Sequence, residues 1–340
     1  MTLATTAHGR PPGGQSPVGV LGTGSYLPGH VVGNDEAGGP AGVDDAWIVR
    51  KTGIRARRWA KPDEATSDLA AAAGRAALKS AGISARDLSL VVVATSTPDT
   101  PQPPTAAVVA DLIGATPATA AFDLNAVCSG FVFALSVVQR TLLASGGHAL
   151  VIGADVYSRI LDRTDRRTTV LFGDGAGAVV LGPTDAGRGV LATHLATFPA
   201  YRDLIEVAAG GSRRPASEET LAEGAHYFRM NGRAVREFVA EHVPPAVHEM
   251  LRRAGVRPDE IDHLVPHQAN AIMLDELADA LGLPNARLHT TVADYGNTGA
   301  ASVPLTLDAA VASGAVRPGD LALLAGFGGG MAAGLALVRC

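Results

Sequence analysis

Apolar residues fall on every face of the helix that the hydrophobic pattern predicts from Phe131 to Leu143. A helix that is apolar on all sides is buried in the protein interior. A predicted strand ends just before it, at Phe122–Leu124, and only a short turn separates the two elements. Cys128 lies in this turn, so the pattern predicts a cysteine at the N-terminus of a core helix.

Cys128 is one of two cysteines in the chain, and the other, Cys340, is the last residue. At a helix N-terminus, the helix dipole and free N–H groups favour a thiolate and can donate to an oxyanion. Most unpaired cysteines are instead small buried apolar residues. The local pattern leaves both interpretations open, and the rest of the chain has to decide between them.

Two helix–strand units recur in the same order along the chain. Leu78–Val92 matches Leu251–Val265 without a gap, and in both segments a glycine follows the last helical turn, as in a helix C-cap. Ala144–Gly146, before one apolar strand, resembles Ala312–Gly314, before another. Two matches in the same order indicate an internal duplication. We therefore expect an α/β fold made of two similar halves.

The duplication predicts where polar side chains meet. It aligns Ala94, at the end of one strand, with His267, and it aligns the helix that begins at Cys128 with the helix that follows Asn297. Ligands of α/β folds bind at the carboxyl ends of strands. We therefore expect Cys128, His267 and Asn297 to converge at the seam between the two halves.

The chain has 340 residues, enough for two domain-sized halves, which we place at 17–185 and 186–340 after a disordered tail at 1–16. Its net charge is −5 and no run of Lys or Arg stands out, which argues against nucleic-acid binding. No stretch is expected to supply the roughly 18 apolar residues of a membrane span. Two cysteines form no disulfide framework, so we expect a soluble cytoplasmic protein.

Five motifs occur in order along the chain. They are D-x-x-x-x-C-x-G-F around Cys128, G-D-G-A-G-A at 173–178, P-H-Q-A-N around His267, G-N-T-x-A-A-S around Asn297 and G-F-G-G-G at 326–330. With the segments at 22–28 and 47–55, they resemble the β-ketoacyl-acyl-carrier-protein synthase III family from about Val18 to Arg339. Departures from the family pattern favour a member from specialised metabolism, such as polyketide biosynthesis, over a fatty-acid initiator.

The resemblance implies a thiolase-like αβαβα sandwich that forms a homodimer and needs no metal or cofactor beyond its acyl-CoA substrate. In such an enzyme Cys128 attacks the acyl-CoA and carries the acyl group. The N–H groups of Cys128 and Gly329 would stabilise the oxyanion. His267 and Asn297 would stabilise the enolate that forms when a malonyl thioester loses CO2, and this carbanion would attack the acyl group on Cys128.

The same resemblance implies a binding site for CoA. Trp47 would stack on the adenine, Lys51 and Arg166 would lie near the phosphates, and Asn270 would line the pantetheine tunnel. The alternative for Trp47 is a core residue at the edge of the fold. The alternative for Arg166 is a place in a solvated charge cluster.

The helix after P-H-Q-A-N departs from the family pattern. Relatives present basic residues there to an acidic carrier protein, whereas this chain has Ile272 at a position where arginine is common. Its exposed positions are acidic, at Asp275, Glu276 and Asp279. Like charges across an interface suppress docking. A malonyl or other acyl carrier protein is therefore in question as a partner unless other basic residues bind it. The candidates are Arg213, Arg214, Arg229 and Arg233.

Three functions fit these observations to different degrees. The first is condensation of an acyl-CoA with a malonyl thioester, which Asn297 favours as a second donor. The second is a non-condensing acyltransferase that hands the acyl group to a hydroxyl, an amine or another carrier, which the acidic helix favours. The third is a non-catalytic partner subunit, and the complete set of Cys128, His267 and Asn297 argues against it.

Overall fold

Two five-stranded mixed sheets form the framework of the protein, in a computed structural model that describes residues 16–340. The tail expected at 1–16 lies, apart from Ser16, outside the described residues. The first sheet has the order β1-β7-β6-β4-β5 and the second the order β12-β11-β13-β14-β8. The first consists of β1 (Val18–Tyr26), β4 (Leu88–Ala94), β5 (Ala120–Leu124), β6 (His148–Asp155) and β7 (Gly175–Pro183). The second consists of β8 (Gly189–Thr197), β11 (His263–Pro266), β12 (Arg287–Leu288), β13 (Leu321–Gly328) and β14 (Ala332–Arg339).

The two sheets share one pattern of strand directions. In the first sheet β4 is parallel to both of its neighbours, and in the second sheet β11 is. The remaining two pairings of each sheet, β6 with β7 and β7 with β1, or β13 with β14 and β14 with β8, are antiparallel. Gly82 and Gly255 end the equivalent helices α3 (Thr66–Ala81) and α7 (Gly232–Ala254) in the left-handed conformation, with φ of 66° and 68°. The internal duplication predicted from the sequence is confirmed by this topology. The division at 185/186 falls in the turn between β7 and β8.

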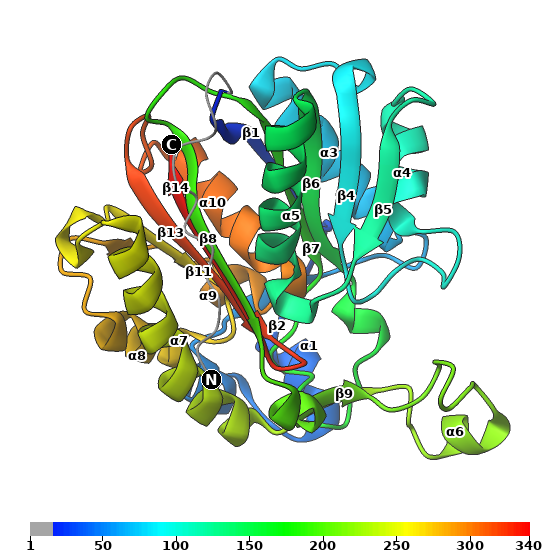
Figure 1. The fold of residues 1–340 in the computed structure, drawn as a ribbon. Coiled ribbons are helices and arrows are strands. Elements are labelled where there is room, and N and C mark those ends of the chain that lie inside the picture. Colours follow the sequence, from blue (N-terminus) through cyan, green and yellow to red (C-terminus); the bar gives the residue numbers. More distant parts are fainter. Residues whose placement is uncertain (1–15) are drawn as a thin grey trace.

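Helices and sheets alternate as five layers (Figure 1). Helices α3 (Thr66–Ala81) and α4 (Thr105–Ile113) cover the outer face of the first sheet, and α7 (Gly232–Ala254) and α8 (Ala271–Leu281) cover that of the second. Helices α5 (Gly130–Ser145) and α10 (Ser302–Ala312) lie between the sheets and contact both. This arrangement is the αβαβα sandwich that the family resemblance implies.

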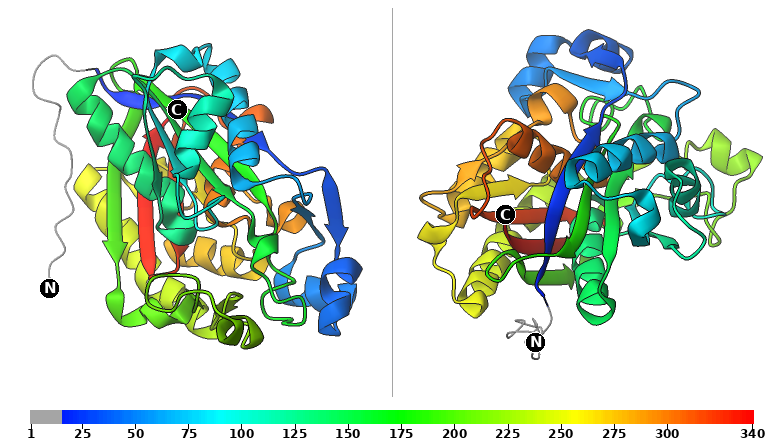
Figure 2. Two further views of the ribbon diagram at one scale, coloured as in Figure 1. Left: turned by 90° about the vertical axis from the view of Figure 1, so that its right-hand side faces the viewer. Right: turned by 90° about the horizontal axis from the view of Figure 1, so that it is seen from above.

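Shorter elements surround the sandwich. Strands β2 (His30–Gly33) and β3 (Ala56–Trp59) pair with each other, and α1 (Asn34–Gly38) and α2 (Asp45–Thr52) lie between them in the sequence. Helix α9 (Val292–Tyr295) precedes α10. Strand β9 (Ile205–Val207) pairs with β10 (Phe228–Met230), and the segment between them carries α6 (Glu218–Ala222). This segment projects from the body of the molecule in Figure 1 and in the right-hand view of Figure 2.

Helix α5 corrects two expectations. Its first two turns are largely buried, but Val137, Arg140 and Thr141 are exposed, so one side of the helix faces solvent. With the turn before it, the helix is also long and apolar enough to cross a membrane, over the 19 residues Val127–Ser145. It lies between the two sheets instead, and its apolar side chains form part of the central core. Its hydrophobicity is therefore explained by packing between the sheets.

Candidate active site

The chain passes from β5 to α5 through a strained turn that carries Cys128. Val127–Ser129 form a 3-10 helix, and Val127 has a φ of 48°, a left-handed conformation that is unfavourable for a β-branched residue. Asn125 Oδ1 accepts a hydrogen bond of 3.0 Å from Val127 N and closes the turn. Cys128 is thereby held at the start of α5 and is 4% exposed.

The end of β13 packs directly on this turn. A Cβ on Gly328 would lie 2.8 Å from Cys128 Cβ and 2.9 Å from Cys128 N, so only glycine fits there. Gly329, which the family resemblance places in the oxyanion hole, is the next residue, and a Cβ on it would lie 3.2 Å from Val127 Cγ2. The contact made by Gly328 was not predicted from the sequence, although the G-F-G-G-G motif contains it.

His267 follows β11 directly and is 3% exposed. Its Nδ1 lies 2.7 Å from Ser302 Oγ at the start of α10, and its ring packs edge-on against Phe327. Burial lowers the pKa of His267 to about 3, against the opposing effect of a hydrogen bond to the Gly299 backbone. The imidazole is therefore neutral at physiological pH and acts as a neutral hydrogen-bond donor or acceptor.

Asn297 lies in the turn before α10 and is 5% exposed. Its backbone is anchored because Asn297 N donates to Leu171 O at 2.8 Å. Its side-chain Oδ1 accepts from Gly299 N at 3.0 Å. The contact repeats the one between Asn125 and Val127 in the first half. The duplication therefore makes Asn297 equivalent to Asn125. The sequence match had instead made Asn297 equivalent to Cys128, at the start of the matching helix.

Cys128, His267 and Asn297 line one cavity of about 150 Å³. The rest of its wall is mostly apolar. The apolar lining residues include Leu171, Phe172, Ile205, Phe228, Met230, Met273 and Phe327. An apolar cavity with a few convergent polar groups has the character of a binding or catalytic site.

Burial, followed by the nearby Asp155 carboxylate, raises the pKa of Cys128 to about 12. A hydrogen bond with Tyr157 acts in the opposite direction and is the smaller effect. The expectation that the helix N-terminus favours a thiolate is therefore wrong for the free protein, because desolvation of the sulfur outweighs it. In the resting state a neutral thiol shares the cavity with a neutral imidazole.

The four residues assigned to CoA by resemblance lie partly at the cavity and partly outside it. Asn270 lines the cavity and also caps α8 through its side chain. Trp47 and Lys51 are one turn apart on α2, and Arg166 Cζ lies 5.8 Å from the centre of the Trp47 ring. These three residues do not line the cavity. Arg167, which no sequence motif singles out, does line it.

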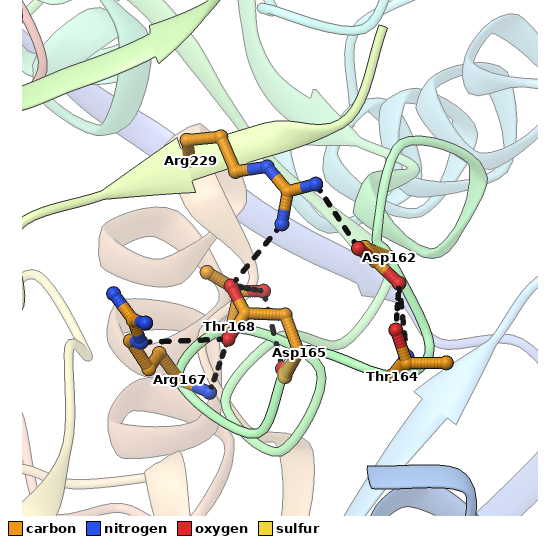
Figure 3. A network of polar contacts seen from close by, with 6 residues as sticks. All are labelled: Asp162, Thr164, Asp165, Arg167, Thr168 and Arg229. Atoms are coloured by element: carbon orange, nitrogen blue, oxygen red, sulfur yellow. Dashed lines mark hydrogen bonds and ion pairs between the residues drawn. The ribbon is translucent and has the colours of Figure 1, made fainter. Parts of the chain in front are cut away.

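A polar network holds the segment that carries Arg167 (Figure 3). Arg229 of β10 pairs with Asp162 at 3.0 Å and with Asp165 at 3.5 Å. Asp165 Oδ1 also accepts from Arg167 N at 3.0 Å. Because two carboxylates hold Arg229, its charge is poorly placed to attract a carrier protein. Two other candidate contacts, Arg214 and Arg233, also pair with carboxylates.

Helix α8 presents Asp275, Glu276 and Asp279 to solvent. Arg236 of the neighbouring helix α7 pairs with Glu276. Asp275 and Asp279 leave the exposed side of α8 with an acidic character. The acidic residues that stand where relatives have a basic docking helix are therefore exposed on the protein surface.

Several residues around the nucleophile were not found from the sequence. Ser302 contacts His267. Tyr157 and Asp155 lie near enough to Cys128 to affect its pKa, and Ser96 hydrogen-bonds both of them. Only Asp155, a carboxylate at the end of an apolar strand, carries a signal that could have marked it, because charged residues are seldom fully buried. Within residues 16–340, no group of three or more His, Cys, Asp or Glu is placed to hold a metal ion.

The duplicated αβαβα fold, with a buried cysteine, a histidine and an asparagine at one cavity, defines an enzyme of the thiolase-like class. Residues 122–199 match the family 3-oxoacyl-(acyl-carrier-protein (ACP)) synthase III, and residues 251–340 match its C-terminal part. The chain is 62% identical to acetoacetyl CoA synthase NphT7 of Streptomyces sp. (strain CL190) over 94% of this chain and 98% of that protein. It belongs to the 3-oxoacyl-(acyl-carrier-protein) synthase III family.

Solved structures agree with this assignment. The 3-oxoacyl-(acyl carrier protein) synthase III of Pseudomonas aeruginosa PAO1 superimposes with a TM-score of 0.86 at 40% identity, covering 95% of this chain and 98% of that one. The priming β-ketosynthase of the R1128 polyketide pathway gives 0.88 at 34% identity, covering 95% and 96%. The protein is thus an acyltransferase of the condensing ketosynthase III type, which joins an acyl-CoA to a malonyl thioester without a cofactor. The non-condensing and non-catalytic alternatives gain no support from these relatives.

Proposed function

We propose that this protein condenses an acyl-CoA with malonyl-CoA, releasing CO2 and one CoA and forming a β-ketoacyl-CoA. Cys128 carries the acyl group, and the N–H groups of Cys128 and Gly329 stabilise the oxyanion of each tetrahedral intermediate. The observation that carries the proposal is the convergence of Cys128, His267 and Asn297 on one cavity.

In this proposal His267 and Asn297 act after acylation. His267 donates to the thioester oxygen of the malonyl group as a neutral imidazole, because burial lowers its pKa to about 3. Asn297 donates through Nδ2, because its Oδ1 already accepts from Gly299 N. Donors of this kind stabilise the developing enolate by roughly 3 to 4 kcal/mol each.

Two observations favour a CoA thioester over a carrier protein as the malonyl donor. The exposed carboxylates of Asp275 and Asp279 on α8 repel the acidic surface of a carrier protein. In addition, the relative at 62% identity is named an acetoacetyl CoA synthase. With an acetyl starter, the same reaction gives acetoacetyl-CoA.

We infer that CoA lies across α2 and the start of α8. Its adenine stacks on Trp47, its phosphates lie near Lys51 and Arg166, and its pantetheine passes Asn270. The proximity of Arg166 to the Trp47 ring supports a shared site for a base and a phosphate. Arg167, in the cavity wall, provides a further guanidinium closer to the thioester.

We further infer a homodimer formed through β5. Among residues 16–340 this strand pairs only with β4, and it is an edge of the first sheet. Phe122 on β5 is 38% exposed, and Leu112 on the adjacent helix α4 is 39% exposed. An exposed apolar edge strand is a template for pairing with a second chain. Light scattering after size exclusion should give twice the chain mass of 34.6 kDa.

The cytoplasmic location stays a prediction.

The test compares two malonyl donors with one acetyl-CoA starter. With malonyl-CoA labelled in its free carboxyl group, we expect acetoacetyl-CoA and one labelled CO2 for each product molecule. With malonyl carrier protein, we expect turnover at least roughly tenfold slower. Faster turnover with malonyl carrier protein than with malonyl-CoA would show that the carrier protein, and not CoA, presents the malonyl group. Acylation of Cys128 without CO2 release would leave only an acyltransferase.

A further inference from the structure

A buried arginine lies beside the turn that carries Asn297. Arg57, in β3, is 0% exposed. Its Nη1 donates to Asn34 Oδ1 at 2.7 Å, and its Nη2 donates to Val170 O at 2.5 Å. Among residues 16–340 it forms no ion pair with a carboxylate, and its Nε has no hydrogen-bond partner. A buried charge is costly unless it is paired, so an arginine held only by neutral acceptors calls for an explanation.

The segment that this arginine holds is the one on which Asn297 rests. Asn297 N donates to Leu171 O at 2.8 Å, and Gly173 N donates to Asn297 O at 3.0 Å. The backbone of Asn297 is thereby fixed at both its N–H and its carbonyl. Val170, whose carbonyl accepts from the guanidinium, directly precedes these two contacts. One buried side chain thus holds the support of the proposed enolate donor.

The stem of Arg57 also packs closely against this support. A Cβ on Gly296, the residue before Asn297, would lie 3.1 Å from Arg57 Cβ, and a Cβ on Gly173 would lie 3.0 Å from it. Gly296 has a φ of 66°, a left-handed conformation that favours glycine. The arginine therefore restrains the turn through packing as well as through its hydrogen bonds.

The other end of the guanidinium leads to helix α2. Asn34 Nδ2 donates to Asp45 Oδ1 at 2.7 Å and to Ile54 O at 2.8 Å. These contacts orient the amide so that its oxygen faces the arginine. Asp45 is the first residue of α2, which carries Trp47. The arginine therefore lies between the helix proposed to bind the adenine of CoA and the turn that carries Asn297.

We propose that Arg57 is a positioning residue for decarboxylation, which holds Asn297 Nδ2 where it can donate to the enolate oxygen. The inference rests on the donor role that the proposed function gives to Asn297. Arg57 does not line the cavity, so it acts through Val170 and the backbone contacts that follow. Because Asn297 acts after acylation, loss of Arg57 slows CO2 release and leaves transfer of the acyl group to Cys128 largely intact.

Two substitutions of Arg57 test this role. Arg57→Met keeps the length of the side chain and removes both donors together with the buried charge, so the fold should persist. Acylation of Cys128 by acetyl-CoA, measured by rapid quenching and intact mass, should stay within a few-fold of the unaltered protein. Release of labelled CO2 from malonyl-CoA by pre-formed acyl-enzyme should fall roughly 10²-fold, as for a reacting group displaced by about 1 Å.

Arg57→Lys gives the same comparison should Arg57→Met not fold. It keeps the cation but has one nitrogen in place of the fork that joins Asn34 to Val170, so CO2 release should fall at least roughly tenfold while acylation persists. Equal loss of acylation and CO2 release in the Arg57 variants would overturn the inference in favour of general support of the fold. So would unchanged CO2 release.

Arg58→Met is the matched control. Arg58 is the next residue of β3, and its guanidinium donates to Pro28 O at 3.3 Å, away from the segment that supports Asn297. Its acylation and CO2 release should both stay within a few-fold of the unaltered protein. A fall in CO2 release as large as that of Arg57→Met would show that any loss of charge from β3 has this effect, and would overturn the specific role.

A double-mutant cycle shows whether Arg57 acts through Asn297. Added to Asn297→Asp, which lacks the Nδ2 donor, Arg57→Met should lower CO2 release little further. Added to His267→Ala, it should lower CO2 release by the full factor seen in the unaltered protein. Equal factors in the two backgrounds would overturn the inference. An unaltered protein that acylates Cys128 but releases no CO2 would instead contradict the proposed function.

Discussion

At the scale of single residues, the site depends on neutral groups in a mostly apolar cavity. Burial keeps Cys128 a thiol and His267 an uncharged imidazole, with pKa values of about 12 and 3. Asn297 is uncharged at any pH, and its Oδ1 is occupied by Gly299 N. Hydrogen bonds from such donors are stronger in a low-dielectric cavity than in water. In the proposed mechanism, stabilisation of the enolate therefore does not require a cationic side chain.

The assignment of the nucleophile has a direct test in the two cysteines. Cys128→Ser should keep the fold and form no stable acyl adduct with acetyl-CoA, because a hydroxyl is a far weaker nucleophile than a thiolate. Cys340→Ser removes the other thiol and should acylate like the unaltered protein. Intact mass after incubation reports both results. A stable adduct on another residue of Cys128→Ser would contradict the assignment.

The proposed donor role of Asn297 can be separated from its structural role. Asn297→Asp keeps an oxygen for Gly299 N and replaces the Nδ2 donor, so CO2 release should fall roughly 10² to 10³-fold while acylation of Cys128 persists. Asn125→Asp makes the same change in the duplicate turn and should stay within a few-fold of the unaltered protein. Equal loss of acylation and CO2 release in Asn297→Asp would show that the two steps are not divided between Cys128 and Asn297.

The lowered pKa of His267 predicts the pH dependence of decarboxylation. A group with a pKa of about 3 is protonated only below that value, so from pH 5 to 8 the imidazole stays neutral. CO2 release from pre-formed acyl-enzyme should therefore be constant across this range. The measurement is labelled CO2 in single turnovers at each pH. A decline with an inflection near 6.5, the ordinary histidine pKa, would show that burial does not control this residue.

At the scale of elements, each half completes the active turn of the other. The end of β13, in the second half, packs through Gly328 against Cys128 in the first. The end of β6, in the first half, packs through Gly153 against Ala300, where a Cβ would clash with the Ala300 carbonyl. Asp155, two residues further on, accepts from Ala300 N at 2.7 Å. These reciprocal contacts explain why the functional groups lie at the seam.

The contact at Gly328 predicts a coupled loss of stability and activity. Gly328→Ala places a methyl group 2.8 Å from Cys128 Cβ, so β13 or the turn must move, at a cost of about 1 to 3 kcal/mol. Acylation should slow as well, because the turn that carries Cys128 shifts. Gly211→Ala, where nothing lies within 4 Å, is the control and should change neither property. Urea unfolding and acylation rates measure the two effects, and an unaltered Gly328→Ala protein would contradict the contact.

The elements that could be predicted from the sequence are those whose evidence is local. The turn at Cys128, the glycine caps and the duplicated units all leave a pattern within a few residues of the chain. The charge state of Cys128 does not, because it depends on burial between two sheets. The contact between Ser96 and Asp155 joins residues 59 positions apart, and neither strand pattern indicates it. Arg167 lines the cavity and Arg166 does not, because adjacent residues of a loop point in directions that the sequence leaves open.

At the scale of the whole molecule, the distribution of charge bears on the proposed choice of malonyl donor. The net charge is −5, and several arginines of α7, β10 and the loop before α6 are paired with carboxylates. The exposed side of α8 adds Asp275 and Asp279 beside the cavity wall formed by Asn270 and Met273. A free CoA thioester needs only local contacts, whereas a carrier protein that docks over α8, as proposed for relatives, would have to cover this acidic surface.

Reversing the charge of α8 should therefore open the enzyme to a carrier protein. Ile272 is 38% exposed and Asp279 is exposed, so Ile272→Arg with Asp279→Lys places two cations on that side. The rate constant kcat/KM with malonyl carrier protein should rise roughly tenfold at low salt and less at physiological salt, because the Debye length falls from about 30 Å at 0.01 M to about 8 Å at 0.15 M. Val311→Arg with Asp185→Lys makes the same change in net charge outside the cavity wall and should have little effect. Turnover of malonyl-CoA should change little in either protein. An equal rise in both double variants would assign the effect to net charge, and no rise in either would mean that α8 is not what excludes the carrier.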